Sequence, residues 1–181
     1  METSRLILRQ WCDDDVAPFA DLNNDPQVMK YFPSTLTYEQ SAQMVEDIRK
    51  HFEQYGFGLW AVEIKDQAKF AGFIGLAVPQ FTAFFTPCIE IGWRLAAPFW
   101  NQGYATEGAR AVLDYGFDEC NLNQVVSFTV PDNIASRRVM ENIGMSYIDN
   151  FDHPGLPDND PLQRHVLYCI TRAERDALQP N

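Results

Sequence analysis

The spacing of hydrophobic and polar residues predicts strands and helices along most of the chain. Over residues 88–95, Ile89, Ile91 and Trp93 alternate with polar or small residues, and this period of two predicts a strand. Over residues 105–117 apolar residues recur every three or four positions, which predicts a helix. The same patterns predict further strands at 5–11, 59–64, 70–78, 125–130, 145–150 and 164–170, and further helices at 13–22, 134–142 and 172–178.

Local signals predict where one more helix begins and ends. Thr37 and Gln40 have the spacing of a capping box, and Gly56 is the type of residue that ends a helix. Met44, Ile48 and Phe52 recur every four residues between them and are predicted to face the core. Residues 27–32 are expected to form a short helical turn before Pro33.

The order of these elements predicts the fold class. It predicts a single α+β (α/β three-layer) domain over residues 1–181, with helices packed on a mixed, mainly antiparallel seven-stranded sheet. Ligands in such folds bind where neighbouring strands separate. We therefore expect ligands to bind at the strand-helix-strand and strand-helix units of the second half.

Composition and charge exclude several classes of protein. Hydrophobic residues make up 46% of the chain and aromatic residues 13%, as in a globular protein. The formal net charge of −11 disfavours binding to nucleic acid, because such affinity needs clustered Lys and Arg. That charge suits a cationic small molecule or a basic peptide, although it would serve solubility equally well.

Cysteines, histidines and apolar runs narrow the picture further. The four cysteines are widely separated and the three histidines form no ligand motif, so we expect neither disulfides nor a metal. No apolar run reaches the roughly 20 residues that a membrane span needs. Arg9 interrupts the first apolar stretch at once, which speaks against a signal peptide and predicts a cytoplasmic protein.

The turn at residues 101–105, between the predicted strand and the helix of the second half, has the features of a phosphate site. Gly103 can adopt positive φ, and the start of the following helix presents unpaired N–H groups and the positive end of the helix dipole. An ordinary turn that binds nothing has the same local sequence. Patterns for an NTPase P-loop and for a hydrolase nucleophile elbow are missing from the sequence.

Two sequence blocks resemble those of the GNAT superfamily of acyl-CoA-dependent N-acyltransferases, in particular the Rim-type branch of ribosomal-protein N-terminal acetyltransferases. The first block contains IEIGWRL (89–95) and FWNQGYATE (99–107). The second block is VPDNIASRRVMENIGM (130–145), and the opening RLILR (5–9) is also typical of that branch. The resemblance implies the GNAT fold, with helices on both faces of the sheet, and acetyl-CoA as co-substrate.

The resemblance also implies which residues bind the coenzyme. The family's pyrophosphate loop has the pattern R/Q-x-x-G-x-G/A, which Gly103 and Ala105 match, whereas Trp100 departs from it. The loop is therefore expected to hold phosphate through backbone N–H groups, and pantetheine to lie along the strand at residues 93–95. The implied contacts are Trp93, Arg94, Leu95, Gln102, Gly103, Tyr104, Ala105, Thr106, Asn133 and Ser136.

Two residues are predicted to move protons. Glu90, flanked by isoleucines, is the candidate base for the ammonium proton, and desolvation would raise its pKa. A solvent-facing position on an alternating strand is the other interpretation of Glu90. Many family members have a Tyr as proton donor where this chain has Met140, and Ser136 stands where the Rim-type branch can use a Ser instead. Ser136 is equally interpretable as a helix-capping hydroxyl, and Asn133 as an N-cap.

These observations predict an N-acetyltransferase that transfers an acetyl group to an amine, either a protein N-terminus or a small molecule. A CoA-binding module with little or no transferase activity is the alternative, suggested by Trp100 and Met140. The acceptor is expected to lie against residues 24–36, 81–87 and 153–161. We expect a monomer or a homodimer, with neither nucleic acid nor membrane as partner.

Overall fold

Seven strands form one sheet in the computed structural model, which describes residues 1–178. The order across the sheet is β1-β2-β3-β4-β5-β7-β6. The strands are β1 (Leu6–Arg9), β2 (Leu59–Ile64), β3 (Ala68–Ala77), β4 (Glu90–Leu95), β5 (Gln124–Thr129), β6 (Ser146–Asp152) and β7 (Arg164–Thr171). The helices are α1 (Val16–Asn24), α2 (Tyr38–Tyr55), α3 (Tyr104–Asp118), α4 (Ile134–Asn142) and α5 (Arg172–Leu178), with short 3-10 turns η1 (Asp13–Asp15) and η2 (Ala97–Phe99). The predicted fold class is confirmed.

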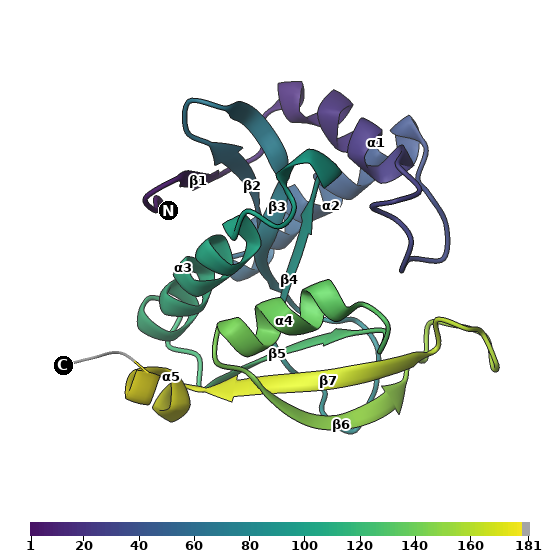
Figure 1. Ribbon diagram of the computed structural model, residues 1–181, viewed down its shortest axis with the longest axis vertical. Helices are drawn as coiled ribbons and strands as arrows, with labels where there is room; N and C mark the ends of the chain where they lie inside the picture. The colour runs from purple at the N-terminus through teal and green to yellow at the C-terminus, as the bar shows by residue number, and fades with distance from the viewer. Residues whose placement is uncertain (179–181) are drawn as a thin grey trace.

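One strand pair differs from all the others in the sheet. β4 and β5 are parallel, whereas every other neighbouring pair is antiparallel. β4 pairs with β3 over its whole length, but its register with β5 is the single pair Glu90–Val126. The two strands therefore meet at the start of β4 and separate afterwards, and the sheet has an upper and a lower half in Figure 1.

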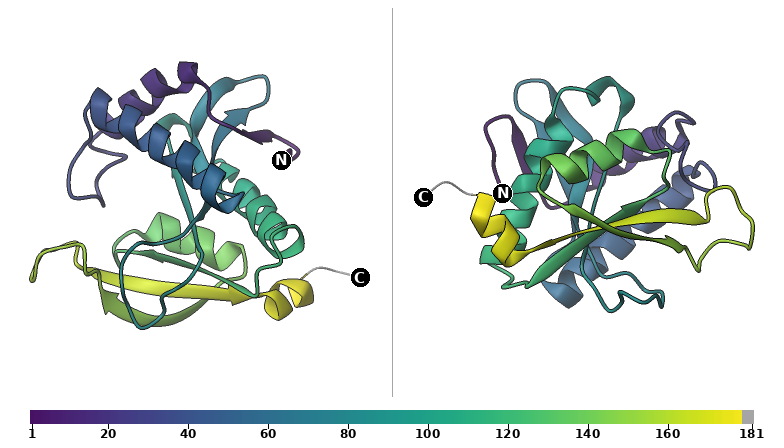
Figure 2. Two further views of the ribbon diagram at one scale, coloured as in Figure 1. Left: turned by 180° about the vertical axis from the view of Figure 1, so that it is seen from behind. Right: turned by 60° about the horizontal axis from the view of Figure 1, so that its bottom comes forward.

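Helices cover both faces of the sheet, as the resemblance implies. α1 and α2 pack on one face, where Phe19 and Val45 contact Ala61 and Phe73. α3 and α4 pack on the opposite face, in a larger cluster with residues of six strands. Figure 1 shows α3 and α4 in front of the sheet, and the reverse view in Figure 2 brings α2 to the front.

The predicted helix signals hold with two local differences. The capping box forms, because Thr37 Oγ1 accepts from Gln40 N at 3.3 Å and Gln40 Oε1 accepts from Thr37 N at 2.8 Å. The most buried row of α2 is Ser41, Val45 and Ile48, and Met44 and Phe52 lie at its margin. Residues 26–31 form hydrogen-bonded turns and not a helix, since only Asp25 to Met29 closes a helical bond before Pro33.

Within residues 1–178, no helix has the length and apolarity that crossing a membrane requires. The same part of the chain has no group of three or more His, Cys, Asp or Glu that could hold a metal ion.

Candidate functional site

The separation of β4 from β5 leaves a wedge in the sheet, which we call the β4–β5 wedge. Backbone groups alternate between the two edges of a strand. Val126 N donates to Ile89 O at 2.9 Å, and Ser127 Oγ donates to Ile91 O at 2.9 Å. The backbone groups of the odd residues of β4 therefore face β5, and those of Trp93 and Leu95 face the open part of the wedge. Unpaired strand edges of this kind bind extended ligands by adding a strand.

The even residues of β4 are oriented differently. Ala96 N donates to Ala71 O at 2.9 Å, and the β3–β4 register pairs Arg94 with Phe73. The backbone of Arg94 thus faces β3 and its side chain lies on the α1–α2 face. Of the three predicted pantetheine contacts on this strand, Trp93 and Leu95 have amides that reach the wedge, and Arg94 does not.

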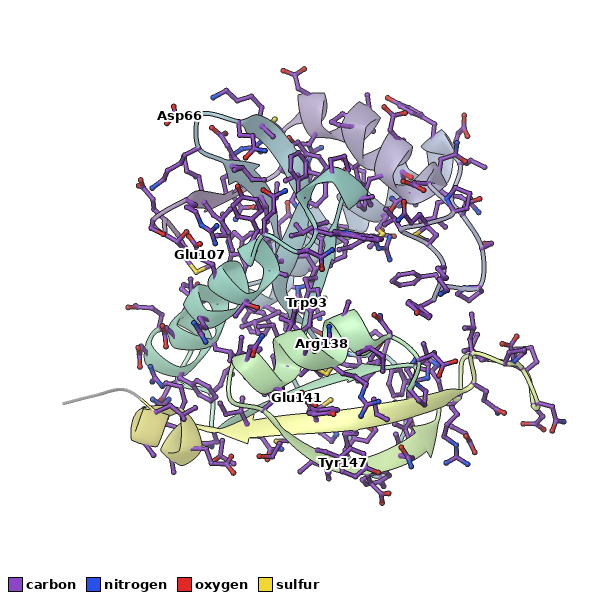
Figure 3. The ribbon with its side chains drawn as sticks, viewed as in Figure 1. Asp66, Trp93, Glu107, Arg138, Glu141 and Tyr147 are labelled. Carbon is purple, nitrogen blue, oxygen red and sulfur yellow. The ribbon has the colours of Figure 1, made fainter. Side chains whose placement is uncertain are left out.

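The wedge connects the two faces of the sheet. Side chains of paired residues lie on the same face, so Trp93, opposite Ile74, is on the α3 face. Figure 3 shows Trp93 between α3 and α4. Glu90, opposite Ala77, lies on the α1–α2 face with Arg94. Two molecules can therefore meet at the wedge from opposite faces of the sheet.

The predicted phosphate loop lies beside the wedge and has an ordered backbone. Gly103 is the N-cap residue of α3 with φ 80°, a left-handed conformation that favours glycine. The next three residues, Tyr104 to Thr106, are the first turn of α3, where N–H groups have no partner within the helix. These donors and the helix dipole favour an anion here.

Trp100 stabilises this loop, which explains its departure from the family pattern. Its Nε1 donates to Leu95 O at 2.7 Å, joining the loop to the end of β4. Gln102 Nε2 donates to Pro98 O at 2.8 Å and adds a second tie within the turn. The side chain of Trp100 thus shapes the loop instead of supplying a charge.

Arg5, which precedes β1, contacts this loop, and the sequence alone did not predict that contact. Its Nη1 donates to Gln102 O at 2.9 Å, and its Nε pairs with Glu107 Oε2 at 2.6 Å. Glu107, at the start of α3 in Figure 3, also accepts from Thr3 Oγ1 at 2.6 Å. Hydrogen bonds from Thr3, Ser4 and Arg5 outweigh burial and lower the pKa of Glu107 to about 2. Arg5 and Glu107 are 102 positions apart in the sequence, so no local pattern could have predicted their ion pair.

Glu90 has the desolvated environment that was predicted, although Ile89 and Ile91 lie on the opposite face of the strand and do not provide it. Glu90 lies where β3, β4 and β5 come together, and this burial raises the pKa of its carboxyl to about 8. Its Oε1 is 3.9 Å from the place that a Cβ on Gly92 would take, so the carboxyl leans along β4 toward Gly92. A carboxyl with such a pKa can accept a proton near neutral pH.

The second sequence block forms the other side of the wedge. Asn133 is the N-cap of α4, because its Oδ1 accepts from Ser136 N at 3.2 Å while its Nδ2 donates to Thr129 Oγ1 at 3.0 Å. The capping role of Asn133 is therefore present. The backbone N–H of Ser136 donates to the Asn133 cap. The Ser136 hydroxyl has no hydrogen-bond partner among residues 1–178. Met140 is fully buried in the core.

The residues 24–36 expected at the acceptor side lie against the wedge at one point. Tyr31 OH donates to Asp132 O at 2.9 Å, so the segment between α1 and α2 reaches the turn before α4. Figure 1 shows this segment beside the near end of α4. The contact joins the two halves of the molecule across the wedge, and it involves residues 101 positions apart, which a sequence pattern cannot relate.

The other two expected segments pack against each other. The ring centroids of Phe81 and His153 are 4.6 Å apart, and those of Phe85 and Phe151 are 4.8 Å apart. Residues 81–87 therefore cover the base of the loop at 153–161. In this cluster Phe84 is the exposed aromatic residue.

Cys88 does not have the properties of a nucleophile. Burial, with a smaller contribution from the charge of Glu90, raises the pKa of its thiol to about 11. A thiol that stays protonated near neutral pH is a poor nucleophile. Cys88 is therefore not a candidate for covalent catalysis.

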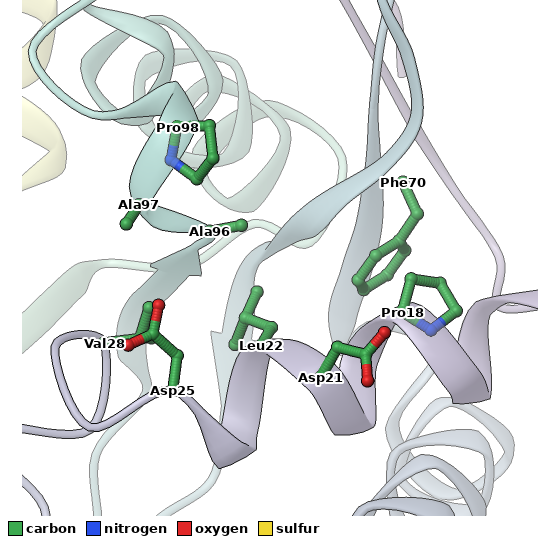
Figure 4. Close-up of a pocket in the computed structure, with 9 residues that line it drawn as sticks. All are labelled: Pro18, Asp21, Leu22, Asp25, Val28, Phe70, Ala96, Ala97 and Pro98. Atoms are coloured by element: carbon green, nitrogen blue, oxygen red, sulfur yellow. The ribbon is translucent and has the colours of Figure 1, made fainter.

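A separate hollow of about 250 Å³ lies between α1 and the turn after β4. Figure 4 shows Asp21, Asp25 and Leu22 on one side of it and residues 96–98 on the other. Neither Glu90 nor Ser136 lines it, and its ionisable lining residues are Asp21 and Asp25. We therefore place the site at the wedge.

Comparison with known proteins agrees with this geometry. Residues 5–146 match the family described as Acetyltransferase (GNAT) domain. The uncharacterized N-acetyltransferase YnaD from Bacillus subtilis (strain 168) is 34% identical over 172 residues, which cover 95% of this chain and 96% of YnaD. FsC-acetyl coenzyme A-N(2)-transacetylase from Aspergillus fumigatus is 33% identical over 166 residues, covering 84% of this chain and 68% of that protein.

A solved structure has the same architecture. The acetyltransferase (GNAT family) from Bacillus anthracis is 28% identical, with a TM-score of 0.79, and the match covers 96% of this chain and 99% of that chain. The shared fold thus extends beyond the matched family region to nearly the whole chain.

Proposed function

This chain belongs to the acetyltransferase (GNAT) domain family, and we propose that it transfers an acetyl group from acetyl-CoA to an amine by direct attack of the amine on the thioester. One observation carries the proposal: Trp100 ties the open end of β4 to the turn before α3, whose free N–H groups and dipole favour an anion. An extended pantetheine and a pyrophosphate need these two features side by side.

The chain offers backbone groups for most coenzyme contacts. The backbone of Trp93 and the N–H of Leu95, whose carbonyl already accepts from Trp100, would hydrogen-bond pantetheine amides, and residues 102–106 would hold the pyrophosphate. Asn133 has one further amide hydrogen beyond its bond to Thr129 for a contact with the coenzyme. Acetyl-CoA, when bound, supplies the activated acetyl group.

Each protein group has a defined task in the transfer. The amine forms a bond to the acetyl carbon and loses a proton to Glu90, directly or through water. A backbone N–H of β4 stabilises the developing oxyanion, a contribution of about 2.7–4 kcal/mol where such donors have been removed. The carbon–sulfur bond breaks, and Ser136 donates a proton to the departing thiolate; solvent then returns a proton to Ser136 and takes up the one held by Glu90. Products are the acetylated amine and free CoA.

The acceptor is either a protein N-terminus or a small amine, and a monomer or homodimer in the cytoplasm would suit both. The name of the Aspergillus fumigatus relative describes transfer from acetyl coenzyme A to an N(2) nitrogen, which supports an amine acceptor. The alternative, a CoA-binding module without transfer activity, is less well supported, because Trp100 and Met140 have structural roles here.

An acceptor screen distinguishes the two functions. Purified protein is mixed with acetyl-CoA and a panel of amines and N-terminal peptides, and free thiol is followed. We expect thiol release that depends on one class of amine, with one acetylated amine per thiol. Tight CoA binding without amine-dependent release would establish the module, and no binding of CoA by calorimetry would contradict both.

Replacing Ser136 by alanine is expected to lower kcat by about a hundredfold, the lower end of typical proton-transfer contributions. The hydroxyl makes no bond within residues 1–178, so its loss should leave the thermal midpoint unchanged. Ser136→Thr keeps a hydroxyl and should recover part of the rate, while Ser146→Ala on the exposed start of β6 is a matched control. A Ser136→Ala enzyme with full kcat would leave Ser136 without a catalytic role.

A further inference from the structure

Arg94 is a partly buried cation with no acidic partner among residues 1–178. Its Nη1 donates to Asn23 Oδ1 at 2.6 Å, and its Nε is buried without a hydrogen-bond partner in the same part of the chain. The chain has 25 acidic and 14 basic residues, yet no carboxylate pairs with this guanidinium. Burying a charge without a counter-charge is costly, and it lowers the pKa of Arg94 to about 10.

The surroundings of Arg94 hold the guanidinium in one orientation. Asn23 is fully buried, and its Nδ2 donates to Ser41 Oγ, also fully buried, at 3.1 Å. The ring of Phe32 lies 4.1 Å from the guanidinium carbon, and that of Phe73 lies 5.4 Å from it. Of the guanidinium nitrogens, only Nη1 is hydrogen-bonded within residues 1–178, and the aromatic rings contact the flat faces of the guanidinium. Nη2 makes no hydrogen bond within residues 1–178 and, unlike Nε, is not a buried atom, so this nitrogen is open to an anionic group of a ligand, with which Arg forms strong charge-assisted hydrogen bonds.

The position of Arg94 relates it to the acceptor and not to the coenzyme. Its side chain is on the α1–α2 face of β4, the same face as Glu90, and the two residues are roughly 13 Å apart along the strand. Phe32, which covers it, belongs to the segment between α1 and α2 that also contacts Asp132 across the wedge. The phosphate loop starts from the opposite, α3 face.

We infer that Arg94 binds a carboxylate of the acceptor, so that the acceptor is an amine that also carries a carboxylate. This inference rests on the proposed acetyl transfer and narrows its substrate class. An acceptor with both groups has no net charge, so the overall charge of −11 does not repel it as it would a simple anion. Asn23, Ser41 and Phe32 are then positioning residues for Arg94.

Matched acceptors test the inference. Each amine is assayed as a free carboxylate and as its carboxamide, with wild type, Arg94→Gln and Arg49→Gln, the last removing a surface guanidinium on α2. Wild type and Arg49→Gln should prefer the carboxylate. Arg94→Gln should raise KM for the carboxylate by about 10- to 100-fold, as expected for lost hydrogen bonds between charged groups, and leave the carboxamide nearly unchanged.

Two outcomes would overturn the role of Arg94: no carboxylate preference in the wild type, or an equal loss for both acceptors in Arg94→Gln. If Arg94→Gln fails to fold, two other measurements decide. Arg94→Lys should keep part of the preference, and sodium acetate should inhibit the wild type competitively against the acceptor, relative to sodium chloride of equal ionic strength. Absence of transfer to every amine would instead contradict the proposed function.

Discussion

Replacing Glu90 by glutamine is expected to lower kcat/KM for acetyl transfer by about 10²- to 10⁴-fold, the usual range for a general base. The carboxyl lies at the point where the β4–β5 wedge opens, and burial raises its pKa to about 8. Wild-type kcat/KM should therefore rise with pH and level off above about pH 8, and this limb should be lost in Glu90→Gln. Glu53→Gln, an exposed change on α2, is the matched control.

The acceptor's own ammonium group also titrates, so the pH profile needs a second acceptor whose amine has a different pKa. The part of the pH profile that reports Glu90 should have the same apparent pKa with both acceptors. The part that reports the acceptor's amine should shift with the pKa of that amine. A profile that moves entirely with the amine, together with an unchanged rate in Glu90→Gln, would remove Glu90 as the base.

The same carboxyl predicts how stability depends on pH. Its folded pKa of about 8 lies above the ordinary value of 4.5, so the folded state holds a proton that the unfolded state releases. The contribution of Glu90 to stability is therefore greatest below about pH 4.5 and falls as pH rises through about 8. Glutamine imitates the protonated form. Glu90→Gln should unfold at a higher temperature than wild type above pH 8 and at a similar one at acid pH.

Gly103→Ala is expected to weaken acetyl-CoA binding by about tenfold, measured as Kd by calorimetry. Gly103 has φ 80°, and a side chain in the left-handed region costs about 1–2 kcal/mol. An added Cβ would also lie 3.4 Å from Arg5 Nη2. The loop should relax away from the conformation that aims its N–H groups at phosphate, and binding would have to restore it.

Gly56→Ala provides the matched control for this change. Gly56 ends α2 with φ 75°, and no atom lies within 4 Å of its added Cβ, so the substitution introduces a similar backbone strain away from the loop. It should lower the free energy of unfolding by a similar amount and leave the Kd for acetyl-CoA unchanged. Equal Kd values for Gly103→Ala and wild type would contradict a backbone grip on the coenzyme.

Local patterns were sufficient to predict the elements of this fold. Alternation along residues 88–95 and the capping signals at Thr37 and Gly56 depend on neighbours in sequence, and each is present in the structure. Residues 27–32 were predicted as a short helical turn before Pro33, and the structure has hydrogen-bonded turns over 26–31 with a single helical bond, from Met29 N to Asp25 O. The register and the order of the strands depend on contacts between distant residues, so local patterns could not predict them.

The site divides in the same way between local and long-range features. The glycine turn at Gly103 follows from adjacent residues, whereas Glu90 is desolvated where β3, β4 and β5 come together and not by its neighbours in sequence, because Ile89 and Ile91 lie on the opposite face of the strand. The contact of Arg5 with Gln102 joins residues 97 positions apart, and that of Asn23 with Arg94 joins residues 71 positions apart. Arg94 was predicted as a coenzyme contact from its place in the motif, whereas its side chain lies on the opposite face. Strand alternation alone does not say which face meets which ligand.

Backbone amide hydrogen exchange with bound CoA tests most directly whether the coenzyme occupies the β4–β5 wedge. The amides of Trp93 and Leu95 face the open wedge, and those of residues 104–106 begin α3. We predict that saturating CoA slows exchange at these amides while Arg94, already facing β3, changes little. Unchanged exchange at Trp93 and Leu95, with slowing instead at residues that line the hollow of Figure 4, would contradict this placement.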